Sequence, residues 1–280
     1  MANPVAVIIG GTRGIGLAMG RQWLKNQMKN NITPRLFVLG RNVDVKRNQP
    51  LESLIKTHSN CDIHPVAVDL TDPQSIEQAA RIVSINTDTV DYLFHTAGML
   101  HNADSSGKTI EGMPPLPERS FKEMSLEGMT QTFTLNTFAP ALVIKEFSPL
   151  LKKSSTKGYR YKESSQPPVF AAISARVGSI EDNKKGGWTS YRASKAALNM
   201  ILQNAHWEFG MGGKRKIIVM ALHPGTVDTE LSKPFQEMAK KQYEIFPPDY
   251  SAEMLVKLCV NSNAEKSGGF YAYDGNKIPW

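Results

Sequence analysis

A tyrosine and a lysine stand four residues apart in the stretch GGWTSYRASKAALNMI, as Tyr191 and Lys195. On a helix this spacing puts both side chains on one face, one turn apart. A phenol ordinarily titrates near pH ~10, and an ammonium group beside it favours the phenolate and lowers that pKa. The pair is therefore one way to make a tyrosine an acid or base near neutrality. The same spacing also occurs on solvated helix faces, so its meaning depends on the elements around it.

A glycine-rich turn follows the first apolar run of the chain. Residues 5–9 (VAVII) are typical of a strand buried on both faces of a parallel sheet. The turn GGTRGIG over 10–16 comes next and leads into a helical pattern. In this context glycines let the backbone approach a pyrophosphate, and the helix N-terminus supplies amide donors. We therefore expect a dinucleotide site here, with the spacing GxxxGxG in place of GxGxxG.

The remainder of the chain alternates strands with helices. Further strands are expected at 36–39, 64–70, 91–98, 169–173, 216–222 and 269–274, and further helices at 73–85, 121–151 and 234–261. This alternation predicts an α/β protein: a single-domain Rossmann fold over residues 1–280, with a doubly wound, seven-stranded parallel sheet flanked by helices. The basic, serine-rich segment 152–167 is expected to form an exposed loop insertion, and 101–118 a loop.

Two polar residues in this pattern have more than one interpretation. Ser174 follows the strand at 169–173, at the sheet edge where catalytic groups collect, but a lone serine there is more often a cap or turn residue. Asn136 lies inside a helical pattern, where asparagine has poor propensity, and a functional placement and a tolerated polar residue are equally consistent with it.

Composition narrows the class of protein. The net charge is +7, yet its basic clusters interleave with no motif for reading bases, so we expect no nucleic-acid partner. The only cysteines, Cys61 and Cys259, are too few for a disulfide framework, and no metal site is expected. With no apolar run of membrane-spanning length and no signal-peptide pattern, we expect a cytoplasmic protein without a membrane span.

Together these motifs resemble the short-chain dehydrogenase/reductase family, over essentially the whole chain. The family's TGxxxGxG is matched at 9–16 with Ile9 in place of the threonine, and its NNAG appears as HTAG at 95–98. Ser174 lies 17 residues before Tyr191, further than is usual in the family. That longer stretch and the terminal FYAYDGNKIPW resemble the subgroup of bacterial C-factor and insect sniffer-type carbonyl reductases.

The resemblance implies the site residues. Asn136, Ser174, Tyr191 and Lys195 match the catalytic set, with Asn136 expected to position a water in the proton path. The cofactor would be bound by Gly10, Thr12, Arg13, Gly14, Ile15, Gly16, Arg41, Asp69, Leu70, Ala97, Gly98, Tyr191, Lys195, Pro224, Gly225, Val227 and Thr229. NADP(H) is expected, because Arg41 follows Gly40 where an acid would otherwise bind the ribose, and Arg13 lies in the glycine turn.

The activity that follows is NADPH-dependent reduction of an aldehyde or ketone by hydride transfer, with Tyr191 as general acid and a small carbonyl or alcohol as substrate. A regulatory protein of the C-factor type with incidental catalysis is the alternative. A sugar-nucleotide epimerase is a third reading, but its usual GxxGxxG and larger C-terminal region are absent. Family resemblance leaves a homodimer open.

Overall fold

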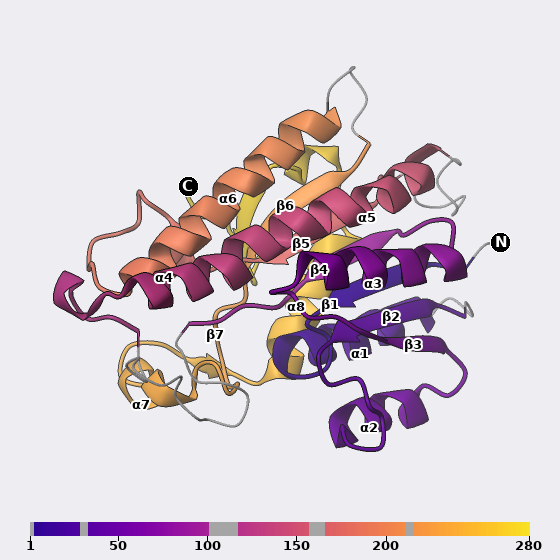
Figure 1. Cartoon of the computed structure of the whole chain (residues 1–280), viewed down its shortest axis with the longest axis horizontal. Helices are drawn as coiled ribbons and strands as arrows, with labels where there is room; N and C mark the ends of the chain where they lie inside the picture. The colour runs from indigo at the N-terminus through magenta and orange to yellow at the C-terminus, as the bar shows by residue number, and fades with distance from the viewer. Residues whose placement is uncertain (1–2, 29–32, 101–116, 157–165, 211–215) are drawn as a thin grey trace.

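The chain is built around a parallel sheet of seven strands in the order β3-β2-β1-β4-β5-β6-β9 (Figure 1). The computed structural model describes residues 3–28, 33–100, 117–156, 166–210 and 216–280. The strands are β1 (Val5–Ile9), β2 (Arg35–Gly40), β3 (Asp62–Ala67), β4 (Tyr92–His95), β5 (Val169–Ile173), β6 (Ile218–His223) and β9 (Gly269–Ala272). Both this order and the parallel pairing confirm the predicted Rossmann arrangement.

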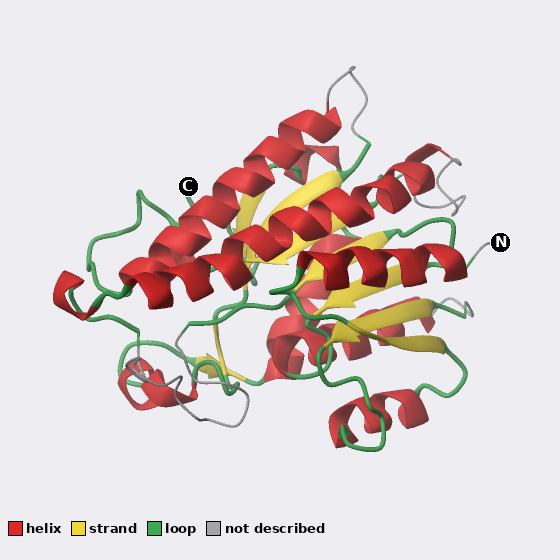
Figure 2. Cartoon of the chain, viewed as in Figure 1, coloured by secondary structure: helices red, strands yellow, loops and turns green. Residues whose placement is uncertain are grey.

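Helices cover both faces of the sheet (Figure 2). The helices are α1 (Gly14–Met28), α2 (Gln49–Thr57), α3 (Pro73–Asn86), α4 (Leu126–Phe133), α5 (Ala139–Thr156), α6 (Thr189–Gly210), α7 (Gln236–Ala239) and α8 (Pro248–Val260). Helices α3, α5 and α6 pack on one face, and α1, α2 and α8 on the other. Because each strand of a doubly wound sheet ends at the same edge, the loops after the strands meet there.

Strand β1 shows why the sheet is buried on both sides. Its side chains alternate between the two cores: Val5, Val7 and Ile9 join the core under α3, α5 and α6, while Ala6 and Ile8 join the core under α1 and α8. None of the five exceeds 3% exposure. A run without polar residues is the pattern that such a central strand requires.

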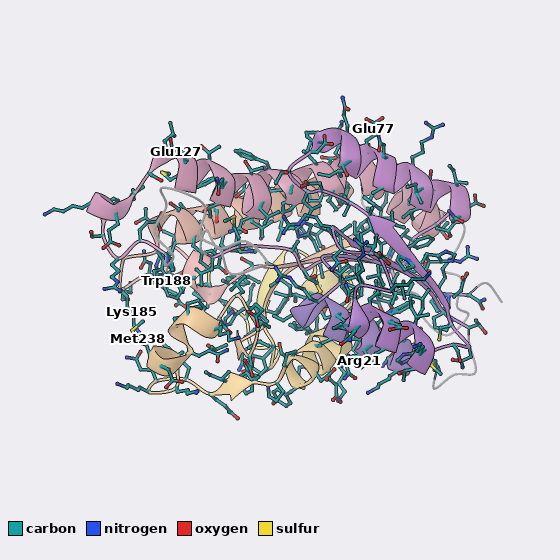
Figure 3. All side chains as sticks on the ribbon, turned by 60° about the horizontal axis from the view of Figure 1, so that its bottom comes forward. Arg21, Glu77, Glu127, Lys185, Trp188 and Met238 are labelled. Atoms are coloured by element: carbon teal, nitrogen blue, oxygen red, sulfur yellow. The ribbon has the colours of Figure 1, made fainter. Side chains whose placement is uncertain are left out.

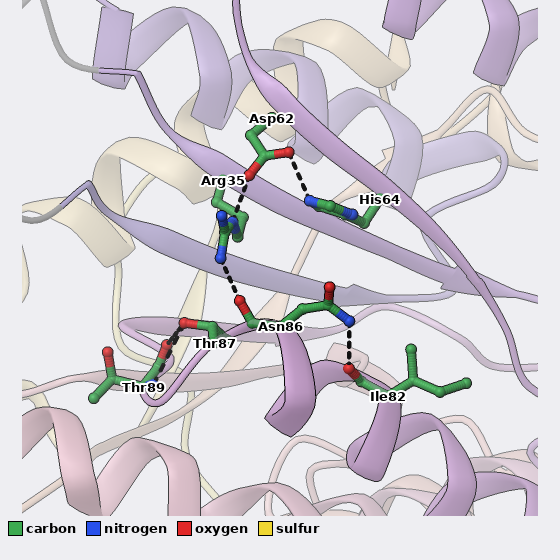
Figure 4. Close-up of polar contacts among 7 residues, drawn as sticks. All are labelled: Arg35, Asp62, His64, Ile82, Asn86, Thr87 and Thr89. Atoms are coloured by element: carbon green, nitrogen blue, oxygen red, sulfur yellow. Dashed lines mark hydrogen bonds and ion pairs between the residues drawn. The ribbon is translucent and has the colours of Figure 1, made fainter.

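The outermost strand of the sheet, β3, is held by polar contacts as well as by packing. Arg35 of β2 donates from Nε to Asp62 of β3 at 2.5 Å, and its Nη1 donates to the carbonyl of Asn86 at the end of α3 (Figure 4). Both members of the ion pair are more than a third exposed, so its contribution to stability is small. Its effect is to fix the position of the outermost strand.

Several boundaries differ from the sequence-based predictions. Helix α5 continues through Thr156, so the start of the segment expected as a loop at 152–167 is helical, and 157–165 lie outside the described residues. Strand β3 ends at Ala67, which leaves Asp69 in the connection after it. A short parallel pair was not predicted: β7 (Thr226–Val227) and β8 (Ile245–Phe246) lie beyond the main sheet. Most of the loop expected at 101–118 also lies outside the described ranges.

Candidate active site

Helix α6 carries the pair with which the sequence analysis began. Tyr191 and Lys195 lie one turn apart in it and both are buried, at 9% and 3% exposure. The Lys195 Nζ lies 5.8 Å from the centre of the Tyr191 ring and donates a hydrogen bond to the carbonyl of Ile173, the last residue of β5, at 2.9 Å. The predicted pairing on one helix face is therefore present, at the carboxyl end of a central strand.

Burial shifts the pKa values of both groups toward their neutral forms. It raises the pKa of the Tyr191 phenol and lowers that of the Lys195 ammonium from 10.5 to about 7. From the spacing we expect Lys195 to lower the pKa of the tyrosine, whereas in this structure desolvation of the buried phenol raises it. A phenol held protonated is poised to donate a proton.

Ser174 is anchored by a residue that the sequence analysis did not single out. Its Oγ donates to Oδ1 of Asn199 at 2.7 Å, and both residues are buried. Asn199 follows Lys195 by four residues, so Tyr191, Lys195 and Asn199 occupy successive turns of one face of α6. Because the serine proton is taken by Asn199, the lone pairs of the hydroxyl are the part left for other partners.

Asn136 lies in a π-helical turn, Thr134–Phe138, between α4 and α5. Its side-chain Oδ1 accepts from the Met99 amide and its Nδ2 donates to the Met99 carbonyl, both at 2.8 Å. The same Nδ2 lies 3.1 Å from Ser194 Oγ on α6. Both ends of the amide are thus used by protein groups, so the side chain ties the segment after β4 to α6. The expected role of Asn136 in positioning a water stays a prediction.

Gly98 joins these groups to the end of β4. A Cβ added at Gly98 would lie 3.2 Å from Asn136 Oδ1 and 3.3 Å from Lys195 Nζ. Any larger residue at this position would have to displace one of the two by a few tenths of an ångström. The loops after β4 and β5, the π-helical turn and α6 therefore converge on one point, and this brings Asn136 and Lys195 to the same place as the end of β5.

The glycine turn after β1 forms a tight cradle at the start of α1. Gly10 and Gly14 have φ values of +82° and +54°, in the left-handed region that favours glycine. A Cβ on Gly10 would lie 2.8 Å from the Ala97 amide nitrogen, and one on Gly16 would lie 2.3 Å from the Gly10 carbonyl oxygen. The turn thus packs backbone against backbone, and leaves the N-terminus of a 15-residue helix facing the sheet edge.

Thr96 supports this turn. The hydroxyl of Thr96 donates to the Ile9 carbonyl at 2.8 Å, linking the end of β4 to β1. The side chain of Thr96 lies against Gly16, where it would collide with an added Cβ. The HTAG sequence, which departs from the family's NNAG, therefore keeps a polar link between the two strands through a different residue.

Two arginines flank the cradle. Thr12 packs against Gly40, where a Cβ would lie 2.7 Å from its Cγ2, so the glycine turn and the end of β2 are in contact. Arg13 and Arg41 follow these two residues and are exposed, and neither guanidinium forms a hydrogen bond or ion pair with another described residue. Asp69 lies nearby: two hydrogen bonds from Thr71 and the charge of Arg41 lower its pKa.

The remaining predicted cofactor residues lie after β6. Gly225 adopts a φ of +77° directly after Pro224, whose carbonyl accepts from Ser251 Oγ at 2.7 Å. Val227 is the second residue of β7, and a Cβ on Gly14 would lie 3.7 Å from Thr229 Cγ2. The predicted set, from Gly10 to Thr229, therefore gathers on one edge of the sheet. Ile15 lies in the first turn of α1, and Leu70 lies in the connection after β3.

This edge of the sheet fits a dinucleotide. It offers a glycine-rich cradle, a helix N-terminus and two exposed guanidinium groups, which are the features that bind a pyrophosphate and further phosphate. Within the ranges that the structure describes, no group of histidine, cysteine or acidic residues could hold a metal ion. Cys61 and Cys259 are free thiols.

Comparison with known proteins identifies the family. A model of the short chain dehydrogenase family matches residues 4–240. The chain belongs to this family. It is accordingly an oxidoreductase, and the resemblance drawn from its motifs is confirmed.

The subgroup is supported by three similar proteins. The carbonyl reductase Sniffer of D. melanogaster matches this short chain dehydrogenase with a TM-score of 0.78 and 25% identity, over 100% of both chains. The NADPH-bound carbonyl reductase from chicken fatty liver matches with a TM-score of 0.77 and 27% identity, also over 100% of both. C-signal of Myxococcus xanthus is 29% identical over 152 residues, which are 54% of this chain and 78% of C-signal.

No helix in the described part of this short chain dehydrogenase has the length and apolar character needed to cross a bilayer.

Proposed function

We propose that this short chain dehydrogenase is an NADPH-dependent carbonyl reductase that converts an aldehyde or ketone to an alcohol. The observation that carries the proposal is the buried pair of Tyr191 and Lys195, one turn apart on α6, beside the glycine cradle at the sheet edge. The similarity of this protein to two carbonyl reductases over their whole length supports the same reaction class.

The residues have distinct roles in the reaction. When bound, NADPH supplies the hydride that adds to the carbonyl carbon. Tyr191 donates its phenolic proton to the carbonyl oxygen, and the raised pKa of the buried phenol keeps that proton in place beforehand. The Ser174 hydroxyl donates to Asn199 in the structure, and on substrate binding it turns to donate its proton to the same carbonyl oxygen. Lys195, near the tyrosine ring, balances the charge left after proton transfer. One hydride and one proton make the alcohol.

The preference for NADP(H) rests on Arg13 and Arg41. Their planar guanidinium groups suit a 2′-phosphate, and Gly40 ends β2 where an acid would repel it. That a similar carbonyl reductase binds NADPH supports this choice.

The test is NADPH oxidation, followed at 340 nm with a panel of aldehydes, ketones and quinones, by wild type and Tyr191→Phe. We expect the wild type to reduce members of the panel and the variant to lose at least about a hundredfold in kcat, as for loss of a general acid. Both should bind NADPH equally, measured by the change in nucleotide fluorescence. Equal activity of the two proteins would contradict the role given to Tyr191.

A regulatory role is the second candidate, and similarity to C-signal favours it. If the protein has a regulatory role, it would bind NADPH tightly, but no member of the panel would cause NADPH oxidation. A homodimer, a cytoplasmic location and a single domain over the whole chain stay predictions from the sequence.

A further inference from the structure

A third apolar cluster lies apart from the two cores and surrounds Tyr191. Its buried members are Leu100, Ala175 and Tyr191, and the half-buried side chains packed against them are Val177, Trp188, Leu231 and Phe235. They come from the connections after β4, β5 and β7 and from the segment before α6. The half-buried members thus present apolar surface beside the residue that donates the proton.

Trp188 enters this cluster from an unusual backbone. Its φ is +52°, and it is the one non-glycine residue with a positive φ among the described ranges. Gly186 and Gly187, directly before it, have φ values of +64° and +65°. A bulky side chain is strained in the left-handed region, where glycine is not. Such outliers persist only where their surroundings enforce them, and they cluster at functional sites.

The surroundings of Trp188 do enforce this conformation. Its amide donates to the Glu118 carbonyl at 2.5 Å, and its own carbonyl accepts from the Arg192 amide at 2.8 Å. The Arg192 Nε donates to the Gly187 carbonyl at 2.8 Å, and the buried Glu118 carboxylate accepts from Ser190 Oγ. The strained turn is therefore tied to the first turn of α6 and to the segment at 117–118.

This backbone places the indole between the catalytic helix and the segment after β7. The Trp188 ring meets the Tyr191 ring edge-on, with centroids 6.4 Å apart, and meets Phe235 in the same manner at 5.2 Å. Figure 3 shows Trp188 between the start of α6 and the segment that bears Met238. Edge and offset contacts are the arrangements that aromatic rings prefer with further rings.

We propose that Trp188, together with Phe235, determines substrate specificity by binding a flat apolar group attached to the reacting carbonyl. This inference rests on the proposed reductase function. The indole edge directs such a group so that its carbonyl oxygen faces Tyr191, and aldehydes or ketones bonded directly to an aromatic ring are the class that fits. A glycine would adopt this backbone conformation without strain. The strain at Trp188 is therefore accounted for by its indole ring and not by the turn.

The test compares benzaldehyde with propanal as substrates, with NADPH as reductant. Trp188→Ala should lower the ratio of kcat/KM for benzaldehyde to that for propanal at least tenfold, whereas Trp188→Phe should retain most of it. Trp207→Ala is the matched control, because Trp207 is a 67% exposed tryptophan on α6, the helix that follows Trp188. An equal loss for both substrates in Trp188→Ala would overturn the proposal and identify the ring as a structural brace.

Trp188→Gly separates the ring from the backbone. It relieves the positive φ, so it should melt at a higher temperature than Trp188→Ala, yet show the same loss of benzaldehyde preference. If Trp188→Gly kept the wild-type ratio, specificity would reside in the backbone and the proposal would fail.

Binding of benzamide, which has no aldehyde or ketone to reduce, gives a readout independent of activity. Calorimetry should show benzamide bound by wild type and at least tenfold more weakly by Trp188→Ala. If no carbonyl is reduced but this difference is found, the proposed reductase function fails and the aromatic site stands. If wild type does not bind benzamide, the aromatic site fails whatever the activity.

Discussion

Replacing Lys195 by methionine should abolish reduction and at the same time stabilise the fold. Burial lowers the Lys195 pKa from 10.5 to about 7. Since each tenfold change in proton affinity is worth about 1.4 kcal/mol, the ionised ammonium costs the folded state on the order of 5 kcal/mol at low pH. Methionine removes this cost but leaves the Ile173 carbonyl without its donor, which costs about 1–3 kcal/mol. We expect a net gain of about 2–4 kcal/mol at pH 6.

The gain should fall as the pH rises. Below pH ~7 the lysine is protonated in folded and unfolded chains alike, so the full penalty is present. Between pH 7 and 10.5 the unfolded chain binds more protons than the folded one. The wild-type free energy of unfolding therefore rises with pH in this window, by up to about 1.4 kcal/mol per pH unit, and Lys195→Met lacks that slope.

The assay is urea unfolding of wild type and Lys195→Met at pH 6, 7, 8 and 9, followed by circular dichroism. Lys216→Met serves as the control, because Lys216 is exposed and its replacement should leave the pH dependence unchanged. Curves of unfolding free energy that run parallel for wild type and Lys195→Met from pH 6 to 9 would refute the reasoning. So would a Lys195→Met protein less stable than the wild type at pH 6.

Two further predictions concern positioning and the cofactor. Asn199→Leu removes the acceptor of the Ser174 hydroxyl and should lower kcat about tenfold, the effect of losing one hydrogen bond that positions the serine. Asn199→Asp keeps an acceptor oxygen and should lower kcat less. Equal kcat values for the two variants would contradict the positioning role of Asn199. Arg13→Ala and Arg41→Ala should each weaken NADPH binding by roughly ten- to a hundredfold with little effect on NADH, and a wild-type preference for NADH in kcat/KM would disprove the NADP assignment.

The sheet and the catalytic pair were predictable because they depend on local patterns. Residues 5–9 are apolar throughout because both sides of β1 are covered, and the glycine turn must follow because backbone approaches backbone there. The spacing of Tyr191 and Lys195 fixes their shared face on any helix. These features can be predicted directly from the order of residue types along the chain.

Other features depend on contacts between distant segments. At the π-helical turn, the Asn136 side-chain amide forms hydrogen bonds with Met99 and Ser194, and neither partner is near Asn136 in sequence. In the sequence Asn199 is an ordinary helix residue, and its contact with Ser174 depends on the packing of β5 against α6. The Tyr191 pKa is set by how completely the neighbouring segments exclude water, which the spacing of one lysine does not reveal.

The single face of α6 also bears on which changes of length this protein can tolerate. Tyr191, Ser194, Lys195 and Asn199 each contact a different part of the site from successive turns. Inserting one residue among them would rotate everything beyond it by about 100° and break the later contacts together. The connection between Ser174 and α6 has no such periodicity. Evolution can therefore lengthen that connection, as the 17-residue separation of Ser174 and Tyr191 illustrates, while insertions within these turns of the helix are forbidden.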